Sequence, residues 1–268
     1  MECAGPRECA NIADMASSKW RRRGLQAFGI VFACALALEI YARYPSNADI
    51  VPLDFPADTA SVVLLFHGSG GRDEPLLIEI TQRIAAGVAN ADGALVRRYV
   101  WSPYSDDRMR ASVHAPVIGR ALGHELAGLA ELSSLRLISH SAGAYVLDPL
   151  CEAYKSAATN PARIEMTFID PIGIVGSWDY WYGYRNHGHC ADFASAYINL
   201  DDIVPGTNAP LHHAYNYDVT QARSRADFDD RGHVWPVRYF LNEVVNAGQA
   251  GNAGNHTDLP RGSVERID

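Results

Sequence analysis

The chain has 268 residues, of which 48% are hydrophobic and 20% are charged, and its formal net charge is −8. This negative balance argues against a nucleic acid or an anionic membrane surface as a binding partner, because both would repel it. Once an N-terminal leader is set aside, roughly 220 residues remain, which is enough for one α/β domain with a single core and too few for two.

The N-terminal segment combines a basic cluster, Lys19–Arg23, with an apolar run from Gly24 to Ala42 that is interrupted by Gln26 and Glu39. A basic flank before an apolar run is typical of a signal peptide or an uncleaved signal anchor, with the basic side left in the cytoplasm. We therefore expect residues 1–45 to be a leader and the rest to be exported to the periplasm or another extracytoplasmic location. If the leader stays uncleaved, residues 24–42 would anchor the protein in the membrane.

After residue 60, apolar β-branched runs alternate with longer helix-forming runs, as in a parallel sheet covered by helices. The strands are expected from Ser61, from Leu135, and near residues 94–101, 164–169, 195–200 and 214–219. The helices are expected near residues 74–90, 113–132, 142–156 and 236–246. We expect an α/β fold over residues 46–247, with a mostly parallel sheet and helices on both faces. The tail, residues 248–268, is rich in Gly, Asn and Ala, so we expect it to be disordered.

A candidate nucleophile follows the apolar strand that begins at Leu135. The chain there reads Ser-His-Ser-Ala-Gly, with Ser141 at the centre and the small residues Ser139 and Gly143 two positions to either side. Small residues at these positions let the backbone turn sharply from strand to helix, so that the central hydroxyl projects clear of the sheet. The first position is usually Gly, and Ser139 departs from the pattern.

A glycine-rich loop, His67–Gly71, follows the strand that begins at Ser61. Such a loop frees backbone N–H groups to bind an anion, and in acyl transfer that anion is the oxyanion of the tetrahedral intermediate. A phosphate-binding loop would require a following Lys-Ser/Thr pair or a full Gly-x-Gly-x-x-Gly pattern, and the chain has neither. We expect the oxyanion hole to use the Gly68–Ser69 region and the N–H of Ala142.

With both elements in this order, residues 60–247 resemble the α/β-hydrolase superfamily, in its lipase and esterase branch. The resemblance implies an α/β-hydrolase fold and a cofactor-free serine hydrolase that cleaves carboxylic esters of a small molecule or a lipid. Alternatives of other classes remain: an acyltransferase with the same Ser-His-Asp triad, or an exported binding protein that keeps the fold without turnover.

The general base of such a triad is expected on a loop after the last core strand, which points to His233. His212 and His213 come before that strand. His140 stands beside the nucleophile and is expected to be structural, whereas His67 is expected to position the glycine loop.

Two carboxylates compete for the third position of the triad. Asp170 lies in an Asp-Pro segment that is similar to the acid segment of pancreatic-type lipases. Asp202 begins an Asp-Ile-Val-Pro segment that looks like the acid segment of fungal-type lipases, and Asp201 is a third candidate. The sequence does not separate Asp170 from Asp202.

An aromatic segment between these two acids is expected to form a cap-like loop over residues 171–192, or alternatively a surface loop that its aromatic side chains hold to the core. Its aromatic side chains suit an acyl or aryl group, and the substrate-binding candidates are Trp178, Trp181 and Tyr182. The nearby set of His187, His189 and Cys190 has no second cluster at structural-zinc spacing, so we expect no metal. Cys151 and Cys190 are the two cysteines of the exported part, and a disulfide between them would join this loop to the core, but their spacing alone does not establish it.

Overall fold

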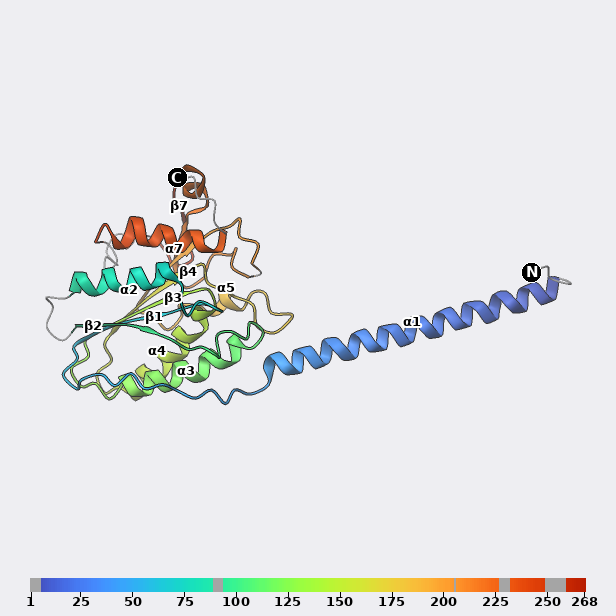
Figure 1. Cartoon of the computed structure of the whole chain (residues 1–268), viewed down its shortest axis with the longest axis horizontal. Helices are drawn as coiled ribbons and strands as arrows, with labels where there is room; N and C mark the ends of the chain where they lie inside the picture. The colour runs from blue at the N-terminus through green and yellow to red at the C-terminus, as the bar shows by residue number, and fades with distance from the viewer. Residues whose placement is uncertain (1–5, 89–93, 205, 227–231, 249–258) are drawn as a thin grey trace. The chain divides into compact units, whose positions relative to one another are not determined.

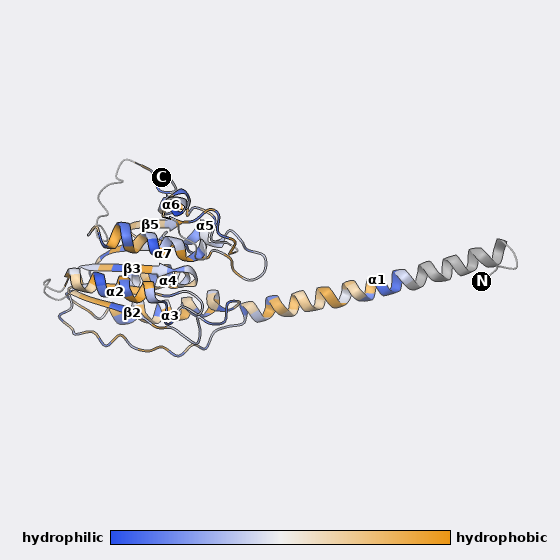
Figure 2. Ribbon diagram, turned by 45° about the horizontal axis from the view of Figure 1, so that its top comes forward, coloured by the Kyte–Doolittle hydropathy of each residue, from blue (hydrophilic) through white to orange (hydrophobic). Residues whose placement is uncertain are grey.

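The computed structural model describes residues 6–88, 94–204, 206–226, 232–248 and 259–268. It divides into two compact units, residues 1–44 and 45–268. The first unit contains helix α1, Pro6–Arg43, whose stretch Trp20–Arg43 is exposed and, after the arginines at its start, mostly apolar (Figure 2). This stretch of 24 residues is long and apolar enough to cross a membrane, and a signal sequence has the same character.

The second unit is an α/β fold built on a seven-stranded sheet in the order β2-β1-β3-β4-β5-β6-β7, and every neighbouring pair is parallel. The strands are β1 Ser61–Phe66, β2 Ala94–Tyr99, β3 Ser134–His140, β4 Arg163–Ile169, β5 Phe193–Ile198, β6 Tyr215–Asp218 and β7 Val264–Arg266. The first six strands confirm the expected alternation along the chain to within a few residues.

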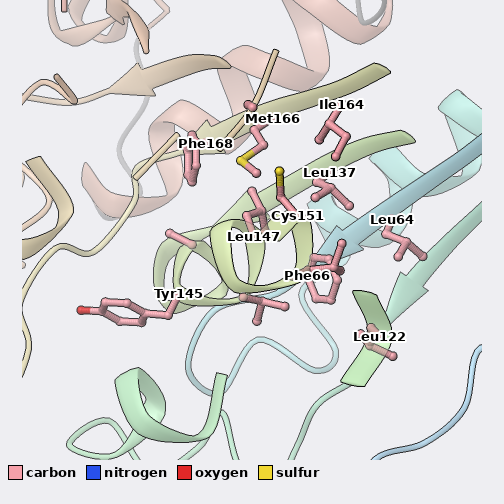
Figure 3. Packing of buried hydrophobic residues seen from close by; sticks show 14 of the residues in the cluster. Leu64, Phe66, Leu122, Leu137, Tyr145, Leu147, Cys151, Ile164, Met166 and Phe168 are labelled. Atoms are coloured by element: carbon pink, nitrogen blue, oxygen red, sulfur yellow. The ribbon is translucent and has the colours of Figure 1, made fainter. Parts of the chain in front are cut away.

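Helices cover both faces of this sheet (Figure 1). One face carries α2, Pro75–Val88, together with α7, Trp235–Tyr239, and the π-helical turn that continues it, Phe240–Val245. The other face carries α3, Ala111–Leu126, and α4, Ala144–Ala157. The apolar face of α4 lies over the middle strands, where side chains such as Leu147 pack against Leu137 and Met166 (Figure 3). A rigid α4 fixes the position of the residues that precede it.

Three short helical elements lie outside the sequence expectations: α5, Tyr182–Asn186; α6, Thr220–Arg225; and a 3-10 turn, Gly232–Val234. The expectation of a disordered tail is wrong for residues 259–268, because β7 pairs with β6 in parallel there. Residues 249–258 lie outside the described part of the chain. The tail composition gave no sign of this strand. Val264 pairs with Asn216 in the sheet, and the pairing is made by backbone hydrogen bonds of neighbouring residues. Such bonds depend little on side-chain type.

A disulfide between Cys151 of α4 and Cys190 joins the aromatic loop to the core, with a Cα–Cα distance of 6.1 Å. Within the loop, the Gly183 N–H donates to the carbonyl of Gly173 at 2.9 Å, and Val175 pairs with Asp179 in an isolated bridge. The disulfide therefore fixes the C-terminal part of the loop, and these backbone contacts fix the part between Gly173 and Gly183.

Candidate active site

The candidate residues gather where four neighbouring strands end. Parallel strands present their carboxyl ends at one edge of a sheet, and α/β proteins bind their ligands at that edge. Here β1 runs into the loop at His67, β3 into Ser141, and β4 into Asp170, while Asp202 follows the end of β5 by four residues. Residues spread over more than a hundred positions of the sequence are thus brought to one edge.

Ser141 occupies a strained backbone position between β3 and α4. Its φ is 53°, in the left-handed region that a residue other than Gly rarely adopts, and the residue is buried. The chain continues through a 3-10 turn, Ser141–Gly143, directly into α4. A Cβ added to Gly143 would lie 2.6 Å from the carbonyl oxygen of Phe66, so the turn passes too close to β1 for any larger residue. This close approach explains the Gly two positions after Ser141.

The glycine loop lies against this turn. A Cβ added to Gly68 would lie 2.6 Å from the Cβ of Ser141, so the loop backbone packs directly against the Ser141 side chain. The carbonyl of Gly68 is 2.8 Å from the Nδ1 of His67 and accepts the Gly71 N–H at 3.1 Å. Because the peptide is planar and trans, the N–H of Ser69 points to the opposite side of that peptide. The hydrogen bonds of the Gly68 carbonyl therefore fix the direction of the Ser69 N–H, in a loop that lies against Ser141.

His67 holds this loop to the neighbouring strand. The Trp101 N–H donates to Nε2 of His67 at 3.3 Å, which leaves the ring proton on Nδ1 to donate to Gly68. Burial lowers the pKa of His67, so the ring stays neutral, as this pattern requires. The side chain is fully buried and positions backbone atoms of the loop.

His233 lies on the 3-10 turn before α7 and contacts both competing carboxylates. Its Nδ1 is 2.7 Å from Oδ2 of Asp170 and 2.8 Å from Oδ2 of Asp202. Both carboxylates are buried, whereas Asp201 is exposed. The sequence left a choice between two acids, and the structure brings both of them to the same ring nitrogen.

Neighbouring polar groups hold the two carboxylates in place. Asp170 Oδ1 accepts the N–H of Asn199 at 3.1 Å, and the Asn199 side chain donates to the carbonyl of Gly232 at 3.1 Å, beside His233. Asp202 Oδ2 accepts the Thr207 hydroxyl at 2.7 Å. Asn199 and Thr207 were missed by the sequence reasoning. Asn199 directly follows β5 at the correct edge and could have been suspected, but nothing in the sequence around Thr207 marks it.

Burial and hydrogen bonding set the protonation of these groups. Burial raises the pKa of Asp170 to about 7, although the hydrogen bond with His233 opposes this rise. Burial also opposes the charge of Asp202, but hydrogen bonds with His233 and Thr207 outweigh it and lower the pKa of this carboxyl. Burial lowers the pKa of His233, but the hydrogen bonds with Asp170 and Asp202 outweigh it and raise the pKa to about 9. The site favours a cationic imidazole next to an ionised Asp202.

His140 supports the imidazole of His233 from the other side. The two rings lie 4.8 Å apart between centroids, and Nε2 of His140 is 3.2 Å from the carbonyl oxygen of His233. Burial lowers the pKa of His140 to about 3, so the ring is neutral and donates its Nε2 proton to that carbonyl. This contact ties the residue next to Ser141 to the backbone of His233.

The other histidines singled out from the sequence lie in the aromatic loop or contact it. Nε2 of His213 is 3.0 Å from the Arg185 carbonyl, and the His212 N–H donates to Tyr184. His187 is buried with its Nε2 3.0 Å from the carbonyl of Ile172. The sulfur of Cys190 is bonded to Cys151, so these residues already have protein partners.

The three substrate-binding candidates differ in exposure. Trp178 is 74% exposed and Trp181 is 58% exposed, whereas Tyr182 is half-buried with its ring 6.0 Å from that of Tyr145. A hollow of about 220 Å³ lies along α4, and Tyr182 lines it with Tyr145, Asp148, His187, His189 and four other residues, none of them a triad candidate. Tyr182 thus packs against Tyr145, which lies in the first turn of α4, four residues after Ser141.

One group of side chains has the composition of a metal site, since ligand atoms of Asp170, Asp202 and His233 lie within 4.8 Å of one another. A tetrahedral metal with bonds of roughly 2.0–2.2 Å would hold its ligand atoms about 3.4 Å apart. The observed separations between nitrogen and oxygen, 2.7 and 2.8 Å, are those of hydrogen bonds. The three side chains therefore have the spacing of a hydrogen-bonded group and not that of the ligands of a tetrahedral metal.

No protein-family model matches the chain, and a search of the curated proteins also finds no match. The interpretation of this edge of the sheet therefore depends on its geometry and chemistry.

Proposed function

We propose that the chain is a serine hydrolase that cleaves carboxylic esters through an acyl-enzyme, with Ser141 as nucleophile and His233 as general base. The observation that carries the proposal is the convergence at one sheet edge of three features. These are a serine on a strained strand-to-helix turn, a glycine loop in contact with it, and an imidazole paired with buried carboxylates. Each feature alone occurs in proteins without catalysis, whereas acyl transfer by a serine triad uses all three together.

In this mechanism, His233 takes the hydroxyl proton of Ser141 as its oxygen attacks the ester carbonyl. The N–H groups of Ala142 and of the Gly68–Ser69 segment bind the oxyanion that forms. His233 then gives its proton to the leaving alcohol, and a water molecule deprotonated by His233 releases the acyl group. Since both carboxylates contact Nδ1, the second ring nitrogen, Nε2, is the one that exchanges protons with Ser141.

The strand arrangement also supports an α/β-hydrolase fold. The strands that lead into the glycine loop, the nucleophile and the two acids are consecutive neighbours, β1, β3, β4 and β5. Helices cover both faces, and the base follows the last of the six core strands in the chain. We propose water as the acyl acceptor, rather than an alcohol, because Trp178 and Trp181 are exposed and do not seal the edge from solvent.

The test is labelling of the full-length chain, in detergent micelles, with a fluorophosphonate probe that reacts with activated serines. We expect Ser141 to be labelled, with no labelling of Ser141→Ala. Ser156→Ala is a matched control, because this exposed serine lies at the far end of α4, and it should label like the parent. Absence of label on folded parent protein would contradict the proposal and favour a binding protein. A labelled chain that transfers its acyl group to added alcohol in preference to water would favour an acyltransferase.

We further propose that the second unit works outside the cytoplasm, attached to α1 as a signal anchor or released from it as a mature protein. The apolar stretch of α1 and the disulfide between Cys151 and Cys190 support this location, because disulfides persist in oxidising compartments. The intact mass of the protein recovered from cells distinguishes retention of residues 1–45 from their removal. Reduced Cys151 and Cys190 in freshly isolated protein would contradict export.

A further inference from the structure

Two buried carboxylates contact the same ring nitrogen of His233, whereas a Ser-His-Asp triad uses one. Nδ1 of His233 carries one proton, and the oxygens at 2.7 and 2.8 Å from Asp170 and Asp202 are equally placed to accept it. The carboxylate oxygens of Asp170 and Asp202 that face His233 lie within 4.8 Å of one another. Two ionised carboxylates so close together repel each other strongly in a buried site, so the pair retains a proton more readily than separate carboxylates would.

The surroundings of the two carboxylates decide which of them is charged. Asp202 accepts the Thr207 hydroxyl and the N–H of Val204 in addition to the proton of His233. Asp170 is completely buried and accepts the N–H of Asn199 besides that proton. Asp202, which accepts more hydrogen bonds, therefore holds the negative charge, and Asp170 is the member that takes up a proton.

Other ionisable groups around the pair are limited in the described part of the chain. His140 faces His233 from the end of β3, and burial keeps it neutral by lowering its pKa to about 3. His67, on the glycine loop, is kept neutral in the same way, because burial lowers its pKa. The Arg223 guanidinium of α6 lies beside Gly232, where an added Cβ would be 3.0 Å from it. Asp170, Asp202 and His233 are thus a coupled group of three.

We propose that Asp170 and Asp202 act as one paired acid for His233. In this pair Asp202 carries the charge opposite the imidazolium, and Asp170 is a positioning residue that binds a proton reversibly and can take over the charge. The proposal rests on the proposed function, because it assigns the third member of the same triad. It replaces a choice between two acids with a role for each.

The pair predicts redundancy. When Asp202 becomes neutral, its repulsion of Asp170 disappears, Asp170 ionises, and the Nδ1 proton of His233 still has an ionised acceptor. When Asp170 becomes neutral, Asp202 keeps its charge. Only loss of both carboxylates lets the imidazole adopt the wrong tautomer, the change that costs about 10⁴-fold in kcat in a triad with one acid.

The first experiment compares Asp170→Asn, Asp202→Asn and the double variant of the full-length chain on a soluble p-nitrophenyl ester. We expect each single variant to lose less than about 100-fold in kcat and the double variant to lose about 10⁴-fold. A single variant that loses as much as the double variant would overturn the proposal, because the other carboxylate would then contribute nothing. Circular dichroism shows whether each near-isosteric variant is folded.

The second experiment needs no turnover and so separates failure of the pair from failure of the proposed function. The histidine resonances of the Ser141→Ala protein are followed by NMR as the pH is changed. We expect the His233 titration to contain an inflection from a second group near neutral pH, and Asp170→Asn in the same background to abolish it. A single-step titration that Asp170→Asn leaves unchanged would overturn the pairing. Failure of Ser141 labelling with the inflection present would overturn the hydrolase assignment and leave the pair standing.

Discussion

Two histidines of this domain lie between two carboxylates, and they differ in ways that matter for chemistry. His233 presents one nitrogen, Nδ1, to both Asp170 and Asp202. His189 uses both nitrogens: Nδ1 lies 3.2 Å from Asp148 and 2.7 Å from the Asn186 carbonyl, and Nε2 lies 2.8 Å from Glu152. In the described part of the chain, the contacts of the His233 ring nitrogens are thus made by Nδ1 alone, whereas His189 has both of its nitrogens engaged.

Burial also separates the two arrangements. The side chain of His233 is 18% exposed and its carboxylates are 0% and 2% exposed, whereas His189 is 40% exposed and its partner Glu152 is 57% exposed. Water screens an exposed ion pair, so its net contribution to stability is small. The same residue types give a structural contact on the outside of α4 and a strongly coupled group at the carboxyl edge of the sheet.

The largest predicted difference is in activity. His233→Ala should lower kcat for ester hydrolysis by roughly 10⁶-fold, because it removes the group that deprotonates Ser141. His189→Ala should change kcat less than twofold, because neither ring nitrogen of His189 is available for the reaction. Steady-state kinetics of both full-length variants on one ester make the comparison. Equal losses in the two variants would show that the wrong histidine has been assigned.

The next effect concerns stability. The double variant Cys151→Ser/Cys190→Ser opens a loop closed over a sequence separation of 39 residues, and loop entropy predicts a loss of about 4 kcal/mol in the free energy of unfolding. Denaturant unfolding measures this loss, and Cys34→Ser, at an exposed position on α1, is the matched control. Because Cys151 packs on the α4 face of the sheet and Val234, the neighbour of His233, packs on the other face, labelling of Ser141 in folded protein should persist. Loss of labelling would mean that the aromatic loop shapes the catalytic edge.

The pH dependence of catalysis separates the two histidines again. The pKa of His233 is raised to about 9, and only the neutral imidazole can accept the Ser141 proton. The value of kcat/KM should therefore increase more than tenfold between pH 7 and pH 9. His189→Ala should leave this profile in place. A plateau already reached at pH 7 would show that the carboxylates do not hold the proton on His233.

The sequence was sufficient for features that depend on local geometry. The turn at Ser141 requires small neighbours because Gly143 passes beside Phe66, and that requirement is visible as a short motif. The alternation of strands and helices likewise predicted six of the strands and the α/β class. Such features are readable because their cause lies within a few residues of the pattern.

Features that depend on contacts between distant segments were not readable. The acid could not be chosen because Asp170 and Asp202 follow adjacent strands, and only the assembled edge shows that both contact His233. The roles of Asn199 and Thr207 are fixed by the same assembly. Strand β7 follows a stretch of low-complexity composition and is held by backbone pairing with β6, so its side chains carried no signal.

The smallest predicted effect is the neutralisation of Glu152. Glu152→Gln should change the free energy of unfolding by less than about 0.5 kcal/mol, because this exposed carboxylate is screened by water and its amide replacement can still accept from His189.

The matched variant Asp148→Asn changes a buried carboxylate that accepts the N–H groups of Gly188 and Cys190. One of these N–H groups would then face an amide donor, at a cost of about 1–3 kcal/mol. Denaturant unfolding at pH 8 distinguishes the two, since burial raises the pKa of Asp148 to about 6 and the carboxyl is ionised at pH 8. Equal losses of stability in the two variants would mean that burial does not distinguish Asp148 from Glu152. The contrast between His189 and His233 would then depend only on which of their ring nitrogens are available.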